Sequence, residues 1–233
     1  MPLLAALSAG PAIAADLQVY PIRIVLDPDN PTATLTVSNR GTDDALLQLS
    51  VDAWSQVDGE EKLDPTRDIL ANPGVFLLKG GEQQVARFAL RVPQDARERS
   101  YRIVVQEVPR TRVEMGLATV LRLLVPVFVP TPNPTVAIDW SVRPGPGGYE
   151  VVAHNGGNIH VQIKTVKLAA EHMPPNEKQL NVYVLPGATK LMRVQVAKPA
   201  PPGATIILTA DSDQGGLSAS VRVGTAEGAS VRP

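Results

Sequence analysis

The chain of 233 residues contains no cysteine. Disulfide bonds, thiolate catalysis and cysteine-based metal sites are therefore excluded, and the stability of the fold depends on core packing. Neither positive nor negative charge is in excess. The chain has 22 Lys and Arg and 23 Asp and Glu, which gives a net charge of −1. General binding to nucleic acid or to an anionic membrane needs a basic surface, so this balance argues against both.

Long apolar segments are also scarce. A membrane-spanning helix needs about 18 uninterrupted apolar residues or more. The most apolar segment, "VEMGLATVLRLLVPVFVP" at 113–130, is interrupted by Glu114, Arg122 and two prolines. We therefore expect no membrane insertion. Another reason is needed for such an apolar segment with a single arginine in it.

The N-terminus, "MPLLAALSAGPAIAADLQ", is an apolar run that ends in small residues. The Ala-Ile-Ala at 12–14 fits the small-x-small pattern that signal peptidase accepts. We expect cleavage after Ala14 or Ala15, which makes 1–15 a signal peptide. No Lys or Arg precedes Arg23, so the basic n-region is missing. The segment is then either a truncated signal or an uncleaved Ala-rich lead.

Proline and glycine are plentiful, at 22 and 18 residues, while charged residues make up only 19%. This composition favours a β-rich fold. Segments that alternate between apolar and polar residues and end at turn residues predict short strands. In the first half the predicted strands are 17–26, 32–39, 46–54, 68–77, 83–92, 100–108 and 113–129. In the second half they are 135–142, 148–155, 159–168, 179–185, 189–197, 204–211 and 216–223.

Turn sequences separate these strands, among them "VDGEE" at 57–61, "KGGE" at 79–82, "PPNE" at 174–177 and "DSDQGG" at 211–216. We interpret the last as a hairpin turn, because it lacks the later carboxylates of a calcium loop. The carboxylates of "VDGEE" are interpreted as a solvated turn.

The segment "PTPNPT" at 130–135 predicts a linker, because its prolines cannot continue a central strand. Seven short strands on each side of it is the count expected of two immunoglobulin-like sandwiches. We therefore predict an all-β chain with two immunoglobulin-like β-sandwich domains joined by a Pro-rich elbow. The predicted domains are 16–130 and 131–225, followed by a polar tail at 226–233.

Catalytic and metal-binding patterns are not found. His154 and His160 flank an "NGGN" turn, but no cysteine is present and no Asp or Glu lies at ligand spacing, so we predict exposed turn histidines and no metal. Neither a phosphate-binding loop nor a Gly-x-Ser-x-Gly elbow is present. The sequence thus predicts a protein that is not an enzyme and needs no cofactor.

The segment 113–123 alternates as a strand does, with successive side chains on opposite faces. An ordinary core strand with Arg122 on its solvent side is one interpretation. However, natural sheets avoid an edge with so little charge unless another strand pairs there. Its large apolar face contains Val113, Met115, Leu117, Thr119 and Leu121, and its other face is small.

Two further arginines interrupt apolar strands. Arg102 lies in "SYRIVVQEVP", and Arg23 lies in "VYPIRIVL". Because consecutive antiparallel strands usually pair, we expect Arg102 near Arg122.

Taken together, these motifs resemble the PapD-like periplasmic chaperones of the chaperone–usher pathway. The resemblance runs from about residue 17 to 223 and is strongest in the first half. No motif decides it alone; their order and spacing carry it. The stretches that carry it are "YPIRIVLDP", "TLTVSNRG", "GGEQQVARF", "SYRIVVQEVP" and the alternating segment 113–123.

The resemblance implies a function by donor-strand complementation, in which the chaperone lends a strand to a pilus subunit whose own sandwich lacks one. Val113, Met115, Leu117, Thr119 and Leu121 would form the donor strand. The partners implied are pilus subunits and an outer-membrane usher, and the location is the periplasm. Self-association through the same strand is a further possibility.

The resemblance also implies a basic pair that holds the C-terminal carboxylate of the subunit. Arg122 falls where the family has its cleft lysine, and Arg23 where it has the first-strand arginine. The common Tyr-Arg-Pro is absent, with "VPVFVP" instead, and "YR" at 101–102 is more similar to the archaic branch, whose pili contain spore-coat-U-like subunits. In that branch Arg102 shares the anchor with Arg122, and Arg23 is either an anchor or a buried structural arginine.

Two other classes of function are weighed against this one. A structural or adhesive β-sandwich surface protein would have an incomplete sandwich, whereas each half here has a full set of predicted strands. A carbohydrate-binding sandwich would expose several aromatic side chains, and this chain has only 2 Trp, 4 Tyr and 3 Phe.

Overall fold

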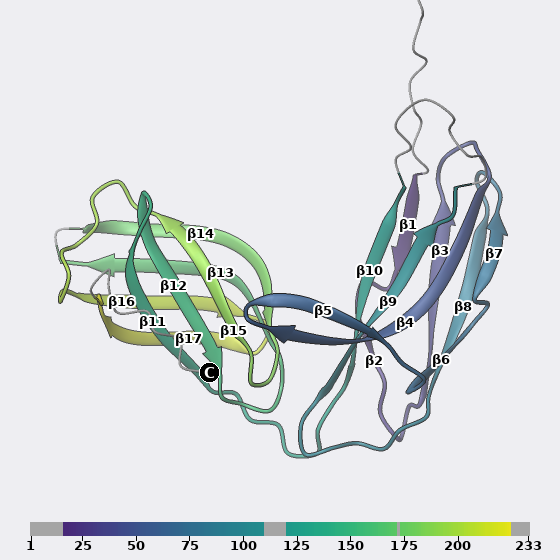
Figure 1. The fold of residues 1–233 in the computed structure, drawn as a ribbon, viewed down its shortest axis with the longest axis horizontal. Helices are drawn as coiled ribbons and strands as arrows, with labels where there is room; N and C mark the ends of the chain where they lie inside the picture. Colours follow the sequence, from purple (N-terminus) through teal and green to yellow (C-terminus); the bar gives the residue numbers. More distant parts are fainter. Residues whose placement is uncertain (1–15, 110–119, 172, 225–233) are drawn as a thin grey trace, which may run out of the picture. The chain divides into compact units, whose positions relative to one another are not determined.

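The computed structural model describes residues 16–109, 120–171 and 173–224. Within these ranges every regular element is a β-strand and no helix occurs. The predicted all-β class is therefore confirmed (Figure 1). The predicted signal peptide at 1–15 and the tail at 226–233 lie outside the described residues.

The chain divides into two compact units. The described residues of the first fall within 1–53, 65–92 and 101–127, and those of the second within 54–64, 93–100 and 128–233. Two segments from the first half of the chain thus belong to the second unit. The limits of the two domains inferred from the sequence, 16–130 and 131–225, stay a prediction.

Two sheets are built from the first half of the chain. One has the order β1 (Leu17–Tyr20), β3 (Thr32–Asn39), β8 (Gln83–Leu90) and β6 (Ile69–Asn72). The other has the order β2 (Ile24–Val25), β10 (Arg122–Val129), β9 (Arg99–Glu107), β4 (Ala45–Val57) and β5 (Glu60–Pro65), and β7 (Val75–Leu78) also pairs with β4.

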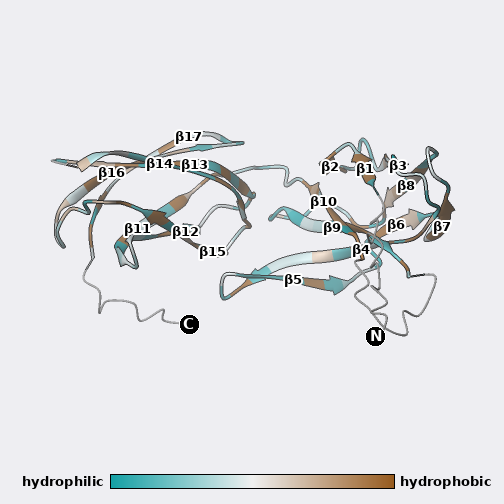
Figure 2. Ribbon diagram, turned by 90° about the horizontal axis from the view of Figure 1, so that it is seen from above, coloured by the Kyte–Doolittle hydropathy of each residue, from teal (hydrophilic) through white to brown (hydrophobic). Residues whose placement is uncertain are grey.

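Alternation along these strands explains the core of the first unit. Leu35 on β3 and Leu47 on β4 are fully buried, while their chain neighbours are more exposed. Fully burying one such side chain stabilises the fold by about 1.5–3 kcal/mol. Figure 2 shows the apolar residues interspersed with polar ones along the strands.

Two of the segments predicted as single strands each form two strands in the structure. The segment 17–26 forms β1 in one sheet and β2 in the other, and the segment 68–77 likewise forms β6 and β7 in different sheets. Pro21 and Pro73 lie at the two breaks. Because proline has no N–H to donate to the ladder, each strand stops there and the chain resumes in the other sheet.

The turn predicted in "VDGEE" is confirmed, and it connects two strands rather than one strand and a loop. β4 ends at Val57 and β5 begins at Glu60. Asp58 and Gly59 have φ values of +52° and +80°, which is the type I′ hairpin turn that matches strand twist. The prediction missed β5 because its sequence, "EEKLDP", is polar and has no clear alternation.

The seven strands of the second half are confirmed, and they form two further sheets. One has the order β11 (Ile138–Gly145), β12 (Gly148–Asn155) and β15 (Thr189–Gln195). The other has the order β14 (Met173–Val184), β13 (Val161–Ala170), β16 (Thr205–Ser212) and β17 (Gly215–Arg222). The turn predicted at 211–216 is confirmed as the β16–β17 hairpin, in which Ser212 lies opposite Gly215.

The turn predicted at "PPNE" is wrong, because 174–177 lies inside strand β14. β14 stands at the end of its sheet, and an end strand tolerates proline on its unpaired side. The pairing with β13 also shifts register between Leu168 and Ala170. Such a bulge absorbs residues that do not fit a regular ladder.

Candidate functional site

Strand β10 lies next to the end of its sheet. It pairs with β9 on one side, and on the other side its partner in the described part of the chain is β2. β2 has two residues, whereas β10 has eight. Pro126 falls within β10, as is usual only for a strand with one side not in a ladder. Within the described residues, the two-residue β2 thus pairs with only a short part of β10 on that side.

The pairing of β9 with β10 is anchored at one end. The Glu107 N–H donates to the Leu121 carbonyl at 2.9 Å, and the Leu121 N–H donates to Glu107 Oε2 at 3.5 Å. Counting back from this contact places Arg122 opposite Gln106. Both side chains are exposed, as expected of two residues that lie opposite each other on the same face of the sheet.

The same count brings Arg102 and Arg122 to neighbouring strands and to one face of the sheet, but not side by side. They are four residues apart along the ladder, from position 102 to position 106 on β9. At about 3.3 Å per residue this corresponds to roughly 13 Å along the strand. Arg122 is exposed, whereas Arg102 is only 8% exposed.

An acidic residue lies across from the buried arginine. Asp52 on β4 is directly opposite Arg102 on β9 in the register of the two strands. Opposite charges in directly opposite positions stabilise an antiparallel pair. Asp52 is half-buried, so this face places one carboxylate across from Arg102.

Only some of the other predicted site residues lie within the described part of the chain. Arg23 is half-buried and lies between β1 and β2, in the chain that passes from one sheet to the other. Leu121 is half-buried immediately before β10. The remaining donor residues, Val113, Met115, Leu117 and Thr119, lie outside the described residues.

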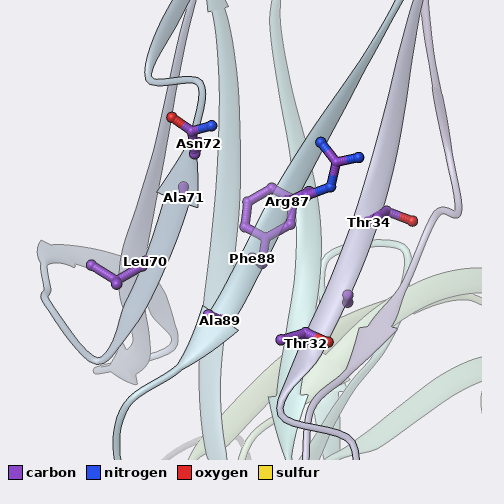
Figure 3. A pocket seen from close by; sticks show the side chains of 9 residues that line it. Thr32, Thr34, Leu70, Ala71, Asn72, Arg87, Phe88 and Ala89 are labelled. Atoms are coloured by element: carbon purple, nitrogen blue, oxygen red, sulfur yellow. The ribbon is translucent and has the colours of Figure 1, made fainter.

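A hollow of about 610 Å³ lies on the first unit's four-stranded sheet (Figure 3). Its wall includes two rows of register partners, Thr32–Ala89–Leu70 and Thr34–Arg87–Asn72, from strands β3, β8 and β6. The side chains that line the hollow include one cation and no carboxylate or imidazole, so it offers no acid–base pair for catalysis.

The second unit contains a polar cluster that the sequence did not predict. His160 was expected to be an exposed turn residue, and this expectation is wrong: it is only 6% exposed. Its Nδ1 lies 2.7 Å from Glu98 Oε1, and its Nε2 lies 3.1 Å from Asp213 Oδ2. These partners lie 62 and 53 residues away in the chain. No local spacing could therefore have revealed the cluster.

Aromatic side chains surround this cluster. The His160 ring is stacked on Phe128, with ring centroids 3.6 Å apart and an interplanar angle of 8°. Tyr183 lies 5.7 Å from His160 and 5.3 Å from Trp54, centroid to centroid. Trp54 and Phe128 are part of the second unit's core. Trp54, Phe128 and Tyr183 thus form or cover the core of the second unit, whereas Tyr20 is 77% exposed.

Two kinds of site are absent from the described residues, a metal-binding cluster and a membrane-spanning helix. In these ranges no three His, Cys, Asp or Glu side chains gather in a way that could hold a metal ion. No helix long and apolar enough to span a membrane occurs among them.

Comparison with known proteins identifies the family. Residues 16–133 match the pili and flagellar-assembly chaperone family, PapD N-terminal domain. The chain is also similar to the probable fimbrial chaperone EcpB of Escherichia coli O157:H7, with 25% identity over 196 residues, which are 81% of this chain and 86% of that protein. The chain therefore belongs to the PapD-type family of pilus-assembly chaperones.

Solved structures show the same fold. The chaperone in the complex of CsuC with the tip subunit CsuE, from archaic chaperone–usher Csu pili of Acinetobacter baumannii, has a TM-score of 0.64. The identity is 20%, and 91% of this chain and 100% of that chain are covered. The Salmonella enterica SafB chaperone, solved with the SafA pilin, has a TM-score of 0.59 at 17% identity, with coverage of 90% and 98%.

Family membership settles the class of function. The chain is a chaperone of pilus assembly and is not an enzyme, which confirms both predictions. Chaperones of this family act in the periplasm. The alternative of a structural or adhesive surface protein is thereby set aside.

Proposed function

We propose that this chaperone holds pilus subunits in the periplasm by lending them residues 113–121 as an added strand, and that it delivers them to an outer-membrane usher. The observation that carries the proposal is the position of β10, whose side away from β9 has only the two-residue β2 as partner in the described ranges. An added strand gains affinity from backbone hydrogen bonds and specificity from alternate side chains.

The alternation of β10 supports the choice of donor residues. At the start of the strand Arg122 and Leu124 are exposed, Leu123 is half-buried and Val125 is buried, whereas 126–129 are buried on both faces. If the strand is extended backwards with the same alternation, Val113, Met115, Leu117, Thr119 and Leu121 fall on the buried parity. The contact of Leu121 with β9 is made at Glu107, the last residue of that strand. Side chains before that point would fill the open groove of a subunit instead of the chaperone's own core.

The anchor for the subunit's C-terminal carboxylate is proposed on Arg102 and Arg122. Arginine suits this role because its planar guanidinium donates two parallel hydrogen bonds to a carboxylate. The "YR" at 101–102 and the fold shared with the Csu chaperone support a place in the archaic branch. Arg23 then has a structural role between the two sheets.

Co-expression in the periplasm with a spore-coat-U-type pilus subunit tests the proposal. We expect the tagged chaperone to co-purify with the subunit one to one, and Leu117→Glu to abolish the complex because a buried charge in the groove is costly. Ile207→Glu, on the exposed face of β16, is the matched control and should retain it. Equal recovery with both variants would rule out the donor segment.

The same segment predicts self-association when no subunit is present. Two chaperones with vacant edges can pair with each other, since an uncovered apolar edge is prone to strand addition. Sedimentation of the free protein should therefore show a dimer that Leu117→Glu converts to a monomer.

A further inference from the structure

His160 lies between two carboxylates that approach it from different parts of the chain. Glu98 immediately precedes β9, and Asp213 is in the turn between β16 and β17. The exposed fraction is 7% for the His160 side chain, 5% for Glu98 and 10% for Asp213. Tyr183 on β14 is the other titratable side chain in ring contact with His160. The cluster is thus buried and holds one base between two acids.

The backbone fixes both carboxylates in place. Glu98 Oε1 also accepts from the His160 N–H at 3.0 Å, and Asp213 Oδ1 accepts from the Gln162 N–H at 2.8 Å. The Glu98 N–H in turn donates to the Asn158 carbonyl at 2.9 Å. Neither acid can turn away from the imidazole without breaking a backbone hydrogen bond.

When both carboxylates are ionised, this geometry requires protons on both ring nitrogens. A neutral imidazole has one N–H and one acceptor nitrogen, while an ionised carboxylate only accepts. With neutral His160, one nitrogen lone pair would face a carboxylate oxygen, and a buried polar group without a donor is costly. An imidazolium instead donates to Glu98 and to Asp213 at once. Its charge also interacts favourably with the face of Phe128 beneath it.

We propose that His160 is a protonated clasp that ties the segment before β9 to the β16–β17 turn and weakens as the surroundings become alkaline. The segment 93–100 leads directly into β9, which carries Arg102. His160 therefore acts as a positioning residue for the start of that strand.

The electrostatics of the cluster agree with this proposal. Burial acts to lower the pKa of His160, but the hydrogen bonds to Asp213 and Glu98, with the charges of both acids, outweigh burial and raise the pKa above its ordinary value of 6.5. A raised pKa in the folded state means that the folded protein binds the proton more tightly than the unfolded chain. The stabilisation is complete below about pH 6.5 and is lost as the pH rises through the folded-state pKa.

Two measurements on the full chain test the clasp. In NMR titrations the imidazole signals of His160, assigned with His160→Gln, should titrate above about pH 6.5. The urea midpoint of the wild type should fall between about pH 6.5 and pH 9. His160→Gln keeps hydrogen-bonding groups but cannot be charged, so most of this fall should be absent in it.

His154→Gln is the matched control and should keep the pH dependence of the wild type. If His160→Gln does not fold, the His160 imidazole signals are assigned through backbone connectivities in the wild type, and the titration of the wild type then decides alone. A His160 that titrates below about pH 6.5 overturns the proposal. A wild-type urea midpoint that stays constant across the same range also overturns it. Both readouts are independent of any pilus subunit.

Discussion

Asn39 and Asn155 make the same set of side-chain hydrogen bonds in the two units. In each, Oδ1 accepts from the N–H of the glycine two residues later, Gly41 at 3.0 Å and Gly157 at 2.9 Å. The Nδ2 of Asn39 donates to the Asp43 and Leu78 carbonyls, and that of Asn155 to the Ile159 and Val184 carbonyls. Both asparagines end a strand, β3 and β12, and both are at most 1% exposed.

The shared pattern has a physical reason. A buried turn leaves backbone N–H and C=O groups without ladder partners, and each must be satisfied. The amide of asparagine supplies one acceptor and two donors from a single side chain. One residue thereby closes its own turn and ties that turn to a distant strand, Leu78 in one unit and Val184 in the other.

Removing either amide should destabilise its unit strongly. We expect Asn39→Ala and Asn155→Ala to lower the free energy of unfolding by about 1–3 kcal/mol each, because buried backbone groups lose their partners. Urea unfolding followed by circular dichroism measures the effect. The exposed Asn133 provides the control, and Asn133→Ala should stay near wild type. Equal midpoints for all three variants would contradict the assigned role.

Gly80 makes a close backbone contact that only glycine allows. A Cβ there would lie 2.2 Å from the Thr42 carbonyl oxygen, so the two turns would have to separate. We expect Gly80→Ala to cost about 1–3 kcal/mol, as overpacking does. Gly216→Ala is the matched control, because a Cβ at that site would meet nothing within 4 Å. Thermal melts of the two variants should separate clearly, and a normal melt for Gly80→Ala would refute the contact.

The alternation of the sequence predicts most strands, and its failures have identifiable causes. Strands such as 32–39 and 148–155 are correct to the residue, because apolar residues at every second position bury one face. Pro21 and Pro73 divide predicted strands between two sheets, a topology that alternation cannot show. β5 was missed because its side chains are mostly polar and exposed; only Leu63 packs against the core of the second unit, so no apolar alternation arises.

The candidate site was predictable only where it rests on strands that follow each other in the sequence. Arg102 and Arg122 were expected on neighbouring strands, and the structure has them so. Their offset along the ladder depends on where β9 and β10 begin to pair, which no residue pattern reveals. The His160 cluster is a long-range contact among three segments and left no local signal, so its burial was missed.

Gln56 joins the β4–β5 hairpin to the second unit's core by a pair of backbone contacts. Its Nε2 donates to the Tyr183 carbonyl at 2.9 Å, and its Oε1 accepts from the Leu185 N–H at 3.0 Å. Gln56→Ala should cost about 1–3 kcal/mol of unfolding free energy, because two part-buried backbone groups lose their partner. Gln48→Ala, at an exposed position on the same strand, is the control. Faster hydrogen exchange at Leu185 in Gln56→Ala only would support the contact, and unchanged exchange would exclude it.

The arginine pair makes the sharpest prediction about subunit capture. Arg102→Ala or Arg122→Ala should weaken binding of a co-expressed subunit by about a hundredfold, since losing a desolvated bidentate charge pair costs a few kcal/mol. Arg102→Lys keeps the charge and loses the planar fork, so binding should be intermediate. The circular dichroism spectrum and the urea midpoint of these variants should stay close to those of the wild type. A changed midpoint would mean that the loss of subunit binding comes from impaired folding.

The offset of roughly 13 Å between Arg102 and Arg122 along the strand makes a double-mutant cycle informative. If both guanidinium groups grip one terminal carboxylate, the double variant will lose less binding than the sum of the single variants. If the two arginines hold different groups of the subunit, the losses will add. Arg23→Ala separates the remaining alternative: a structural arginine lowers the urea midpoint, whereas an anchor lowers binding at an unchanged midpoint. Normal capture by both single variants, Arg102→Ala and Arg122→Ala, would show that the carboxylate is held elsewhere.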